Sequence, residues 1–340
     1  MSKISFNSAA DLGAALQTLP KADENSLTLA RARQDQLTKP QGSLGRLEEI
    51  AIWMASWQKL EKPEINNAVC LVFAGNHGVT ERGVSAYPAE VTQQMVYNFE
   101  AGGAAINQLT KLAGAELNVI ALELDNPTKD FTTAPAMSEA ECCAALQAGA
   151  DAIPDGADLI MLGEMGIGNT TAAAAVANAI FGGSAVDWIG PGTGVDAGGL
   201  EIKRETVAKG IELHKDNQKT AFDILRTVGG RELAAIAGAV VEARHRSIPV
   251  LLDGFIATAA ASALTLDNPA SLDHTLISHV SKEPGHKRLA ERLDKRPVLD
   301  LDMRLGEASG TAVALLIVRA ALATHNGMST FGEAGVSTAS

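Results

Sequence analysis

Apolar and polar residues follow two different patterns along the chain. Short apolar runs typical of strands occupy residues 68–75, 117–124, 158–163, 186–190, 248–254, 275–280 and 296–302. Between most of these runs, apolar residues recur at helical spacing. Strands that alternate with helices predict an α/β fold, in which a parallel sheet is flanked by helices on both faces.

The two ends of the chain lack this alternation. Residues 1–65 contain no strand-like run, and residues 46–60 place apolar side chains at helical spacing. Near the other end, the apolar stretch 312–323 is interrupted by Arg319 and is too short to span a bilayer. We therefore predict a small helical lobe built from residues 1–65 and 306–340, next to an α/β domain of residues 66–305.

Two of the strand-turn-helix segments carry a glutamate just after the apolar run. In residues 159–180 a glycine-rich turn holds Glu164 before an alanine-rich helix, and in residues 297–318 Glu307 stands before a second helix. Ligands of open α/β sheets bind in a crevice outside the carboxyl ends of the strands. Both glutamates can therefore line one crevice.

Glycine-rich turns at these positions suggest an anion site. Free backbone N–H groups and the helix dipole attract anions at a helix N-terminus, which makes the turn at Gly166 and Asn169 a candidate phosphate site. In residues 190–196 three alternating glycines, including Gly192, let the backbone approach a ligand, and Lys203 could supply a cation. An ordinary capped turn and a solvated helix lysine remain the alternatives.

Glu307 has two interpretations. A dry pocket would raise the pKa of its carboxyl group and make it a general base. The alternative is a carboxylate that only complements a helix dipole, which would lower that pKa. A loop after the first strand carries Tyr87. Together with the nearby Met95, Tyr87 could form one wall of a site that binds a flat aromatic ligand.

Composition limits the classes of function. A net charge of −12 argues against nucleic acid or an anionic membrane as the main partner. Three cysteines cannot form a disulfide framework, and the histidines lack metal-site spacing, so we expect neither a metal nor another cofactor. The first residues lack the apolar segment of a secretory signal, and we expect a cytoplasmic protein.

Six segments in order carry a resemblance to a known family. They are TKPQGSLGRLE (38–48), FAGNHGV with GVSAYP (73–88), GEMGIGNTT (163–171), GGRELAAIAGA (229–239), PVLLDGF (249–255) and DLDMRLGEASGTA (300–312). Together they resemble the nicotinate-nucleotide–dimethylbenzimidazole phosphoribosyltransferases of cobalamin lower-ligand synthesis, over roughly residues 38–323. Asn76 departs from the aspartate frequent before the His-Gly pair, and Gln41 departs from a frequent second proline.

The resemblance implies a fold and a reaction. The fold is a Rossmann-like parallel sheet with a small helical lobe from both chain ends, as a homodimer. The reaction moves phosphoribose from nicotinate mononucleotide to 5,6-dimethylbenzimidazole, with inversion at C1′, giving α-ribazole 5′-phosphate and nicotinate. Glu307 matches the family's base, Glu164 the glutamate of its glycine turn, and Lys203 its lysine.

The expected site follows from these matches and from the loop residues around them. The catalytic residues are Glu307 and Glu164. The expected phosphate- and ribose-binding residues are Gly166, Asn169, Gly192, Lys203 and Ser281, and the expected base-binding residues are Tyr87, Met95 and Leu305.

Other functions stay open at this point. The alternatives are a nucleotide-binding protein without catalysis, or phosphoribosyl transfer to a different base. A dinucleotide-dependent oxidoreductase has less support, because no GxGxxG opens a helix with an acidic residue ~20 positions later.

Overall fold

The computed structural model describes residues 3–337, and its centre is one parallel sheet. The strands are β1 (Ala68–Ala74), β2 (Ala115–Ala121), β3 (Leu159–Met165), β4 (Val250–Leu252) and β5 (Thr275–Ile277). Their order is β2-β1-β3-β4-β5, and every neighbouring pair is parallel. The predicted α/β class is confirmed. The direction of winding reverses between β1 and β3, which is where such sheets form a ligand crevice.

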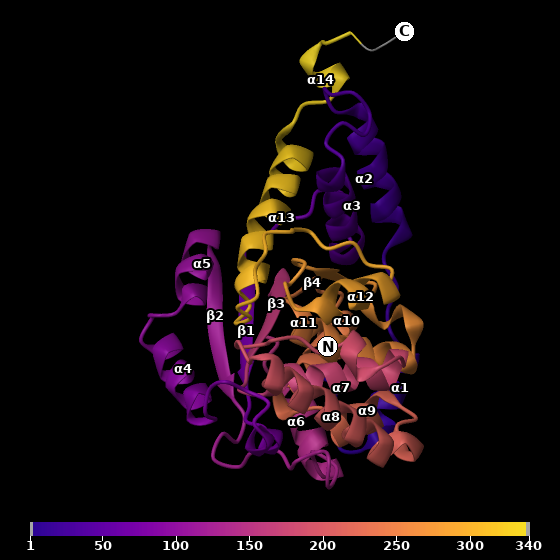
Figure 1. The fold of residues 1–340 in the computed structure, drawn as a ribbon. Helices are drawn as coiled ribbons and strands as arrows, with labels where there is room; N and C mark the ends of the chain where they lie inside the picture. The colour runs from indigo at the N-terminus through magenta and orange to yellow at the C-terminus, as the bar shows by residue number, and fades with distance from the viewer. Residues whose placement is uncertain (1–2, 338–340) are drawn as a thin grey trace.

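Helices cover the sheet and form the connections between its strands (Figure 1). They are α1 (Ala9–Gln17), α2 (Glu24–Gln36), α3 (Arg46–Gln58), α4 (Glu90–Glu100), α5 (Ala105–Ala113), α6 (Glu139–Asp151), α7 (Asn169–Phe181), α8 (Ala197–His214), α9 (Ala221–Val228), α10 (Arg231–His245), α11 (Phe255–Ser262), α12 (Pro284–Arg292), α13 (Ser309–Gly327) and α14 (Phe331–Ala334). No helix of the described residues is both long enough and apolar enough to cross a membrane.

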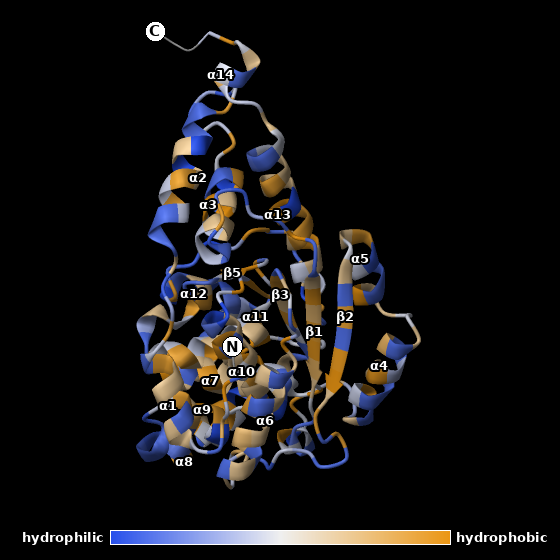
Figure 2. Cartoon of the chain, turned by 180° about the vertical axis from the view of Figure 1, so that it is seen from behind, coloured by the Kyte–Doolittle hydropathy of each residue, from blue (hydrophilic) through white to orange (hydrophobic). Residues whose placement is uncertain are grey.

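The alternation of side chains along a strand explains the two layers of helices. On β1, Val69 and Leu71 belong to the core shared with α6, α7, α10 and α11. Cys70 and Val72 belong to the opposite core, shared with α3, α5 and α13. A central strand must therefore be apolar at every position, and Figure 2 shows β1 hydrophobic along its length while the edge strand β2 carries hydrophilic positions.

Helices from the two chain ends lie side by side above the sheet. The helices α2 and α3 pack together, and α3 packs against α13 (Figure 1). The Arg33 guanidinium donates from Nε to the carbonyl of His325 at 2.8 Å and from Nη2 to that of Met328 at 3.0 Å. The helix α1 departs from the expected segment 1–65, because Leu12 and Leu16 are buried in the core of the main body.

Two of the seven predicted strands do not form. The segment 186–190 overlaps a 3-10 turn, Ala185–Asp187, and its apolar character reflects the burial of Trp188. The segment 296–302 makes a single bridge, between Leu299 and His279. Pro297 lacks the N–H that a ladder needs, and the left-handed backbone of Asp302 (φ 57°) ends the extended stretch.

Candidate active site

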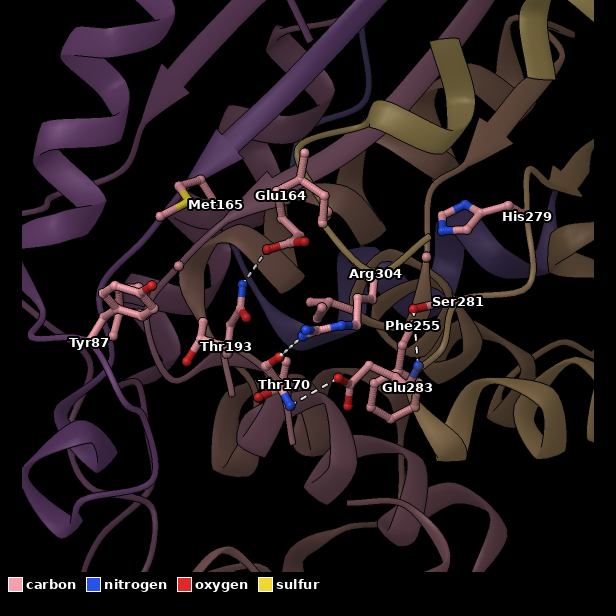
Figure 3. Close-up of a pocket in the computed structure, with 18 residues that line it drawn as sticks. Tyr87, Glu164, Met165, Thr170, Thr193, Phe255, His279, Ser281, Glu283 and Arg304 are labelled. Carbon is pink, nitrogen blue, oxygen red and sulfur yellow. Dashed lines mark hydrogen bonds between the residues drawn. The ribbon is translucent and has the colours of Figure 1, made fainter. Parts of the chain in front are cut away.

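A pocket of about 480 Å³ opens at the carboxyl ends of β3, β4 and β5 (Figure 3). Its wall comes from the segments that follow these strands, from the loop between β1 and α4, from the turn before α8 and from the segment that precedes α13. The lining residues are Tyr87, Glu164, Met165, Gly166, Ile167, Asn169, Thr170, Gly192, Thr193, Gly254, Phe255, Ile256, His279, Ser281, Glu283, Arg304, Leu305 and Gly306.

Glu164 and Glu307 come together at the edge of this pocket, where Glu164 lines the wall and Glu307 directly follows the lining residue Gly306. Glu164 stands near the end of β3, and its carbonyl oxygen accepts a hydrogen bond of 3.2 Å from the Glu307 N–H. Both residues are buried. Gly306 lies between them with φ +81°, and a Cβ there would stand 2.7 Å from Glu164 Oε1. Only glycine lets the chain pass so close to the carboxylate, and it joins the two segments that the sequence placed in one crevice.

Burial changes the acidity of both glutamates. Burial raises the pKa of Glu164 to about 8, the carboxylate of Asp253 adds to this, and the Asn169 amide, which donates to Glu164 Oε2, opposes it. Burial and Asp253 together raise the pKa of Glu307 to about 7. This direction is opposite to the lowering expected of a helix-dipole partner. A carboxylate with such a pKa can take up a proton near neutral pH.

Asp253 and His279 were missed by sequence reasoning. Asp253 follows β4, and its Oδ1 accepts a hydrogen bond of 2.9 Å from the Gly310 N–H. The His279 Nδ1 lies 3.6 Å from the same oxygen, while Asp253 Oδ2 is buried without a hydrogen-bond partner. The signal was present, because Asp253 directly follows the apolar residues of β4, as Glu164 follows the apolar run of β3.

Lys203 supplies a buried cation behind the pocket wall, in contact with the lining residue Thr170. Its Nζ donates to Thr170 Oγ1 at 2.8 Å and to the Gly190 carbonyl at 2.9 Å. The Thr170 hydroxyl therefore accepts from Lys203 and keeps its own hydrogen for another acceptor. Burial lowers the pKa of Lys203 to about 8. This lysine is not a solvated helix residue, since its side chain is 1% exposed.

One backbone N–H expected to bind phosphate, that of Gly192, already donates to the carboxylate of Glu283. The Gly192 N–H donates to Glu283 Oε1 at 2.9 Å, and the Gly192 carbonyl accepts from Arg304 Nη1 at 3.1 Å. Glu283 precedes α12 and is buried, and its Oε2 has no hydrogen-bond partner. Nothing in the local sequence of Glu283 distinguishes it from an ordinary residue at the start of a helix.

Most of the other predicted residues line the pocket. Gly166 and Asn169 lie in the turn before α7, and the Ser281 hydroxyl accepts a hydrogen bond of 3.3 Å from the Glu283 N–H. Tyr87 and Leu305 line its open side and are 53% and 56% exposed. Figure 3 shows Tyr87 and His279 at opposite sides of the cavity.

Glu307 and Lys203 are not lining residues themselves, and Met95, Asn76 and Gln41 also lie outside the pocket lining. Met95 is on α4 and packs against the core shared by α3, α5 and α13, which differs from the expected contact with a base. Asn76 is buried and donates to the Leu124 carbonyl at 3.0 Å, and Gln41 lies in a surface turn. The two departures from the family pattern therefore lie away from the pocket wall.

Two features of the described chain bear on other chemistries. Cys70, Cys142 and Cys143 are free and buried. Within residues 3–337, no group of three or more His, Cys, Asp or Glu side chains is arranged to hold a metal ion.

Comparison with known proteins identifies the family. A family model described as "Phosphoribosyltransferase" matches residues 19–336. A relative from Novosphingobium aromaticivorans, named nicotinate-nucleotide–dimethylbenzimidazole phosphoribosyltransferase, is 57% identical over 97% of this chain and 98% of its own length. The chain belongs to this phosphoribosyltransferase family. A second relative with the same name, from Mesorhizobium japonicum, is 54% identical over 98% of this chain and 99% of its own.

A solved structure supports the same assignment. The phosphoribosyltransferase matches the crystal structure of the enzyme of that name from Thermus thermophilus with a TM-score of 0.86 and 40% identity. The match covers 93% of this chain and all of the other. The protein is therefore a transferase, and its pocket is the candidate active site of a phosphoribosyltransferase.

Proposed function

We propose that this enzyme transfers the phosphoribosyl group of nicotinate mononucleotide to 5,6-dimethylbenzimidazole. The products are α-ribazole 5′-phosphate and nicotinate. Relatives 57% and 54% identical over nearly their whole length carry the name of this activity. One observation supports the proposal: two adjacent buried glutamates, of which Glu164 lines the pocket, lie near a buried lysine that donates to Thr170 in the pocket wall.

The proposed reaction is a displacement at C1′ of the ribose. The bond from C1′ to the pyridinium nitrogen breaks, and its electron pair returns to the ring, which leaves as nicotinate. A benzimidazole nitrogen attacks C1′ from the opposite face, so the configuration inverts. The proton on the other benzimidazole nitrogen passes to the carboxylate of Glu307, whose pKa of about 7 suits a base at neutral pH.

The remaining groups would bind and align the reactants. Lys203, the free hydrogen of the Thr170 hydroxyl and the turn at Gly166 would hold the 5′-phosphate at the start of α7. Glu164, when ionised, would stabilise the positive charge that builds on the ribose. Alignment of two bound reactants accounts for much of the rate in such transfers. We further infer a homodimer, as the family resemblance implies.

The side of the pocket expected to bind the acceptor base favours a second candidate function. Tyr87 and Leu305 are each more than half exposed, so the wall expected to hold the base is open. Transfer of the same phosphoribosyl group to another benzimidazole, a purine or a phenol is the alternative that this openness favours.

A discontinuous assay tests the proposal. Purified enzyme is incubated with nicotinate mononucleotide and 5,6-dimethylbenzimidazole without added metal, and nicotinate and α-ribazole phosphate are separated by chromatography. Appearance of both products in equal amounts is the expected result. Product only with another base would select the alternative acceptor. Nucleotide binding without nicotinate release from any acceptor would contradict catalysis and favour a binding protein.

A further inference from the structure

The carboxylate of Glu283 stands among the groups that would receive a phosphate. Its Oε1 accepts the Gly192 N–H at 2.9 Å. A Cβ on Gly192 would lie 2.8 Å from Thr170 Oγ1 and 2.9 Å from Lys203 Nζ. The backbone of Gly192 therefore touches the pair formed by Lys203 and Thr170, and Glu283 bonds to the same backbone.

Glu283 is held at this place without full compensation. The side chain is 5% exposed, and Oε2 has no hydrogen-bond partner. A buried carboxylate oxygen without a donor is unfavourable, and a role toward a ligand is one reason for a protein to retain it. The positive charges of Lys203 and Arg304 favour its ionised form, while burial opposes that form and raises its pKa.

These contacts set the charge balance of the anion site. Two basic side chains, Lys203 and Arg304, lie near one carboxyl group, Glu283, so basic groups outnumber acidic groups at this end of the site. A dianionic phosphate entering this low-dielectric site is attracted by both cations and repelled by Glu283. The repulsion applies to every anion, whether or not the anion has a ribose attached.

We propose that Glu283 is a specificity-determining residue, which makes free inorganic anions weak ligands and reserves the anion site for a complete nucleotide. This inference rests on the proposed function. A nucleotide offsets the repulsion through its ribose and base, which contact the rest of the pocket. Inorganic phosphate has no such contacts, so it bears the whole penalty. The Glu283 carboxylate also accepts the Gly192 N–H, so this donor already has a partner when the nucleotide is absent.

The test compares two ligands and two matched variants. Inorganic phosphate and ribose 5-phosphate are titrated calorimetrically into wild type, Glu283→Gln and Glu291→Gln. Glutamine keeps an oxygen that accepts the Gly192 N–H, so the loop retains its bond. Glu291 lies exposed on α12, and its variant removes the same charge at the surface. Thermal unfolding of each variant shows that the fold is retained.

The expected result is a Kd for inorganic phosphate about tenfold lower in Glu283→Gln than in wild type. In Glu291→Gln the Kd stays unchanged. Ribose 5-phosphate gains less than phosphate, and phosphate becomes an inhibitor of the variant's transfer reaction. A phosphate Kd that is unchanged or higher in Glu283→Gln overturns the proposal.

Other outcomes also decide it. A loss of ribose 5-phosphate affinity with unchanged phosphate affinity would show that Glu283 accepts a ribose hydroxyl instead. If neither ligand binds any of the proteins, the anion site itself is misplaced and this inference fails. The chromatographic assay of nicotinate release decides the proposed function separately, so the two failures can be told apart.

Discussion

At the scale of single residues, the backbone of Glu307 and Ala308 is unusual. Both residues have φ of 61°, a left-handed conformation that costs a non-glycine residue roughly 1–2 kcal/mol. The bond from the Glu307 N–H to the Glu164 carbonyl helps to hold this conformation. Strain of this kind concentrates at functional sites. The left-handed conformation aligns the Glu307 backbone with the end of β3, next to Glu164.

Replacement of the base tests this arrangement most directly. We expect Glu307→Gln to lower kcat by about 10²–10⁴, the usual contribution of a general base. Glutamine has the same shape and cannot take the proton, so the KM for nicotinate mononucleotide should change little. Steady-state rates of nicotinate release measure both constants. A variant with the wild-type kcat would remove Glu307 from the role of base.

The neighbouring Asp253 should set the pH at which the base works. Its carboxylate helps to hold the pKa of Glu307 at about 7, because two like charges in one buried site repel each other. Activity should therefore fall as pH decreases through about 7, where Glu307 becomes protonated. In Asp253→Asn the repulsion is lost, the pKa of Glu307 decreases, and the acid limb moves to lower pH.

The pH profile of kcat/KM for the two proteins measures this shift. If the acid limb of the profile stays at the wild-type pH in Asp253→Asn, that limb reports the titration of a group other than Glu307. Glu291→Gln, which removes a surface charge on α12, serves as the control for a general electrostatic effect.

Part of the site could be predicted from the residues themselves. Glu164 follows an apolar run that forms a central strand, and this order places it at the edge of the sheet. Glu307 reaches the same edge although the run 296–302 before it forms no strand, so its position depends on the contact between β3 and the start of α13. Glu283 and His279 depend on how distant segments fold back, which no local pattern records. Met95 was placed near the pocket by its distance along the chain, yet α4 turns its side chain toward the core.

At the scale of elements, the contact between β3 and α13 positions both glutamates. A Cβ on Gly163 would lie 2.3 Å from the Ala308 backbone nitrogen, so the strand and the start of the helix touch directly. Glu164 and Glu307 are the residues next to this contact in sequence. The absence of a side chain at Gly163 therefore sets the separation of the two segments that carry the glutamates.

We expect Gly163→Ala to push β3 and the start of α13 apart. Overpacking of this kind costs about 1–3 kcal/mol of stability, and the displaced glutamates should lower kcat as well. Urea unfolding and nicotinate release measure the two effects. The control is Gly327→Ala at the other end of α13, where a Cβ would meet nothing within 4 Å. Equal behaviour of the two variants would contradict the role of this contact.

The elements also show where hydrophobic patterning fails. The runs at 68–75 and 158–163 became central strands, because a strand covered on both faces must be apolar throughout. The run at 186–190 is equally apolar, but this segment forms a turn in which the Trp188 side chain is buried. Periodicity cannot separate a buried turn from a buried strand in so short a run.

At the scale of the whole molecule, the buried acids make stability depend on pH. The pKa of Glu164 is raised to about 8 in the folded protein, against about 4.3 in an unfolded chain. Between these values the folded state binds more protons, so the free energy of unfolding decreases as pH rises. The enzyme keeps this group although it weakens the fold at neutral and alkaline pH.

Glu164→Gln should therefore stabilise the protein at high pH. A glutamine oxygen can still accept from the Asn169 amide, and the buried charge is gone. We expect a higher Tm than wild type at pH 8.5 and a smaller difference at pH 5.5, where the wild-type carboxyl group is protonated. Calorimetric unfolding at the two pH values measures this. An equal change in Tm at both would show a packing effect and no titration.

The packing of α13 against α3 has a consequence for how the enzyme is synthesised. Arg33 and His325, which join α2 to α13, are 292 residues apart in sequence, so the segment that contains His325 must leave the ribosome before they meet. Until then Glu307 has no fixed place, and the face of β1 that carries Cys70 and Val72 lacks the part of its cover that α13 supplies. A chain terminated early is therefore inert as a catalyst and exposes apolar surface that chaperones and proteases recognise. Catalytic competence and the burial of this apolar surface therefore both depend on the synthesis of α13.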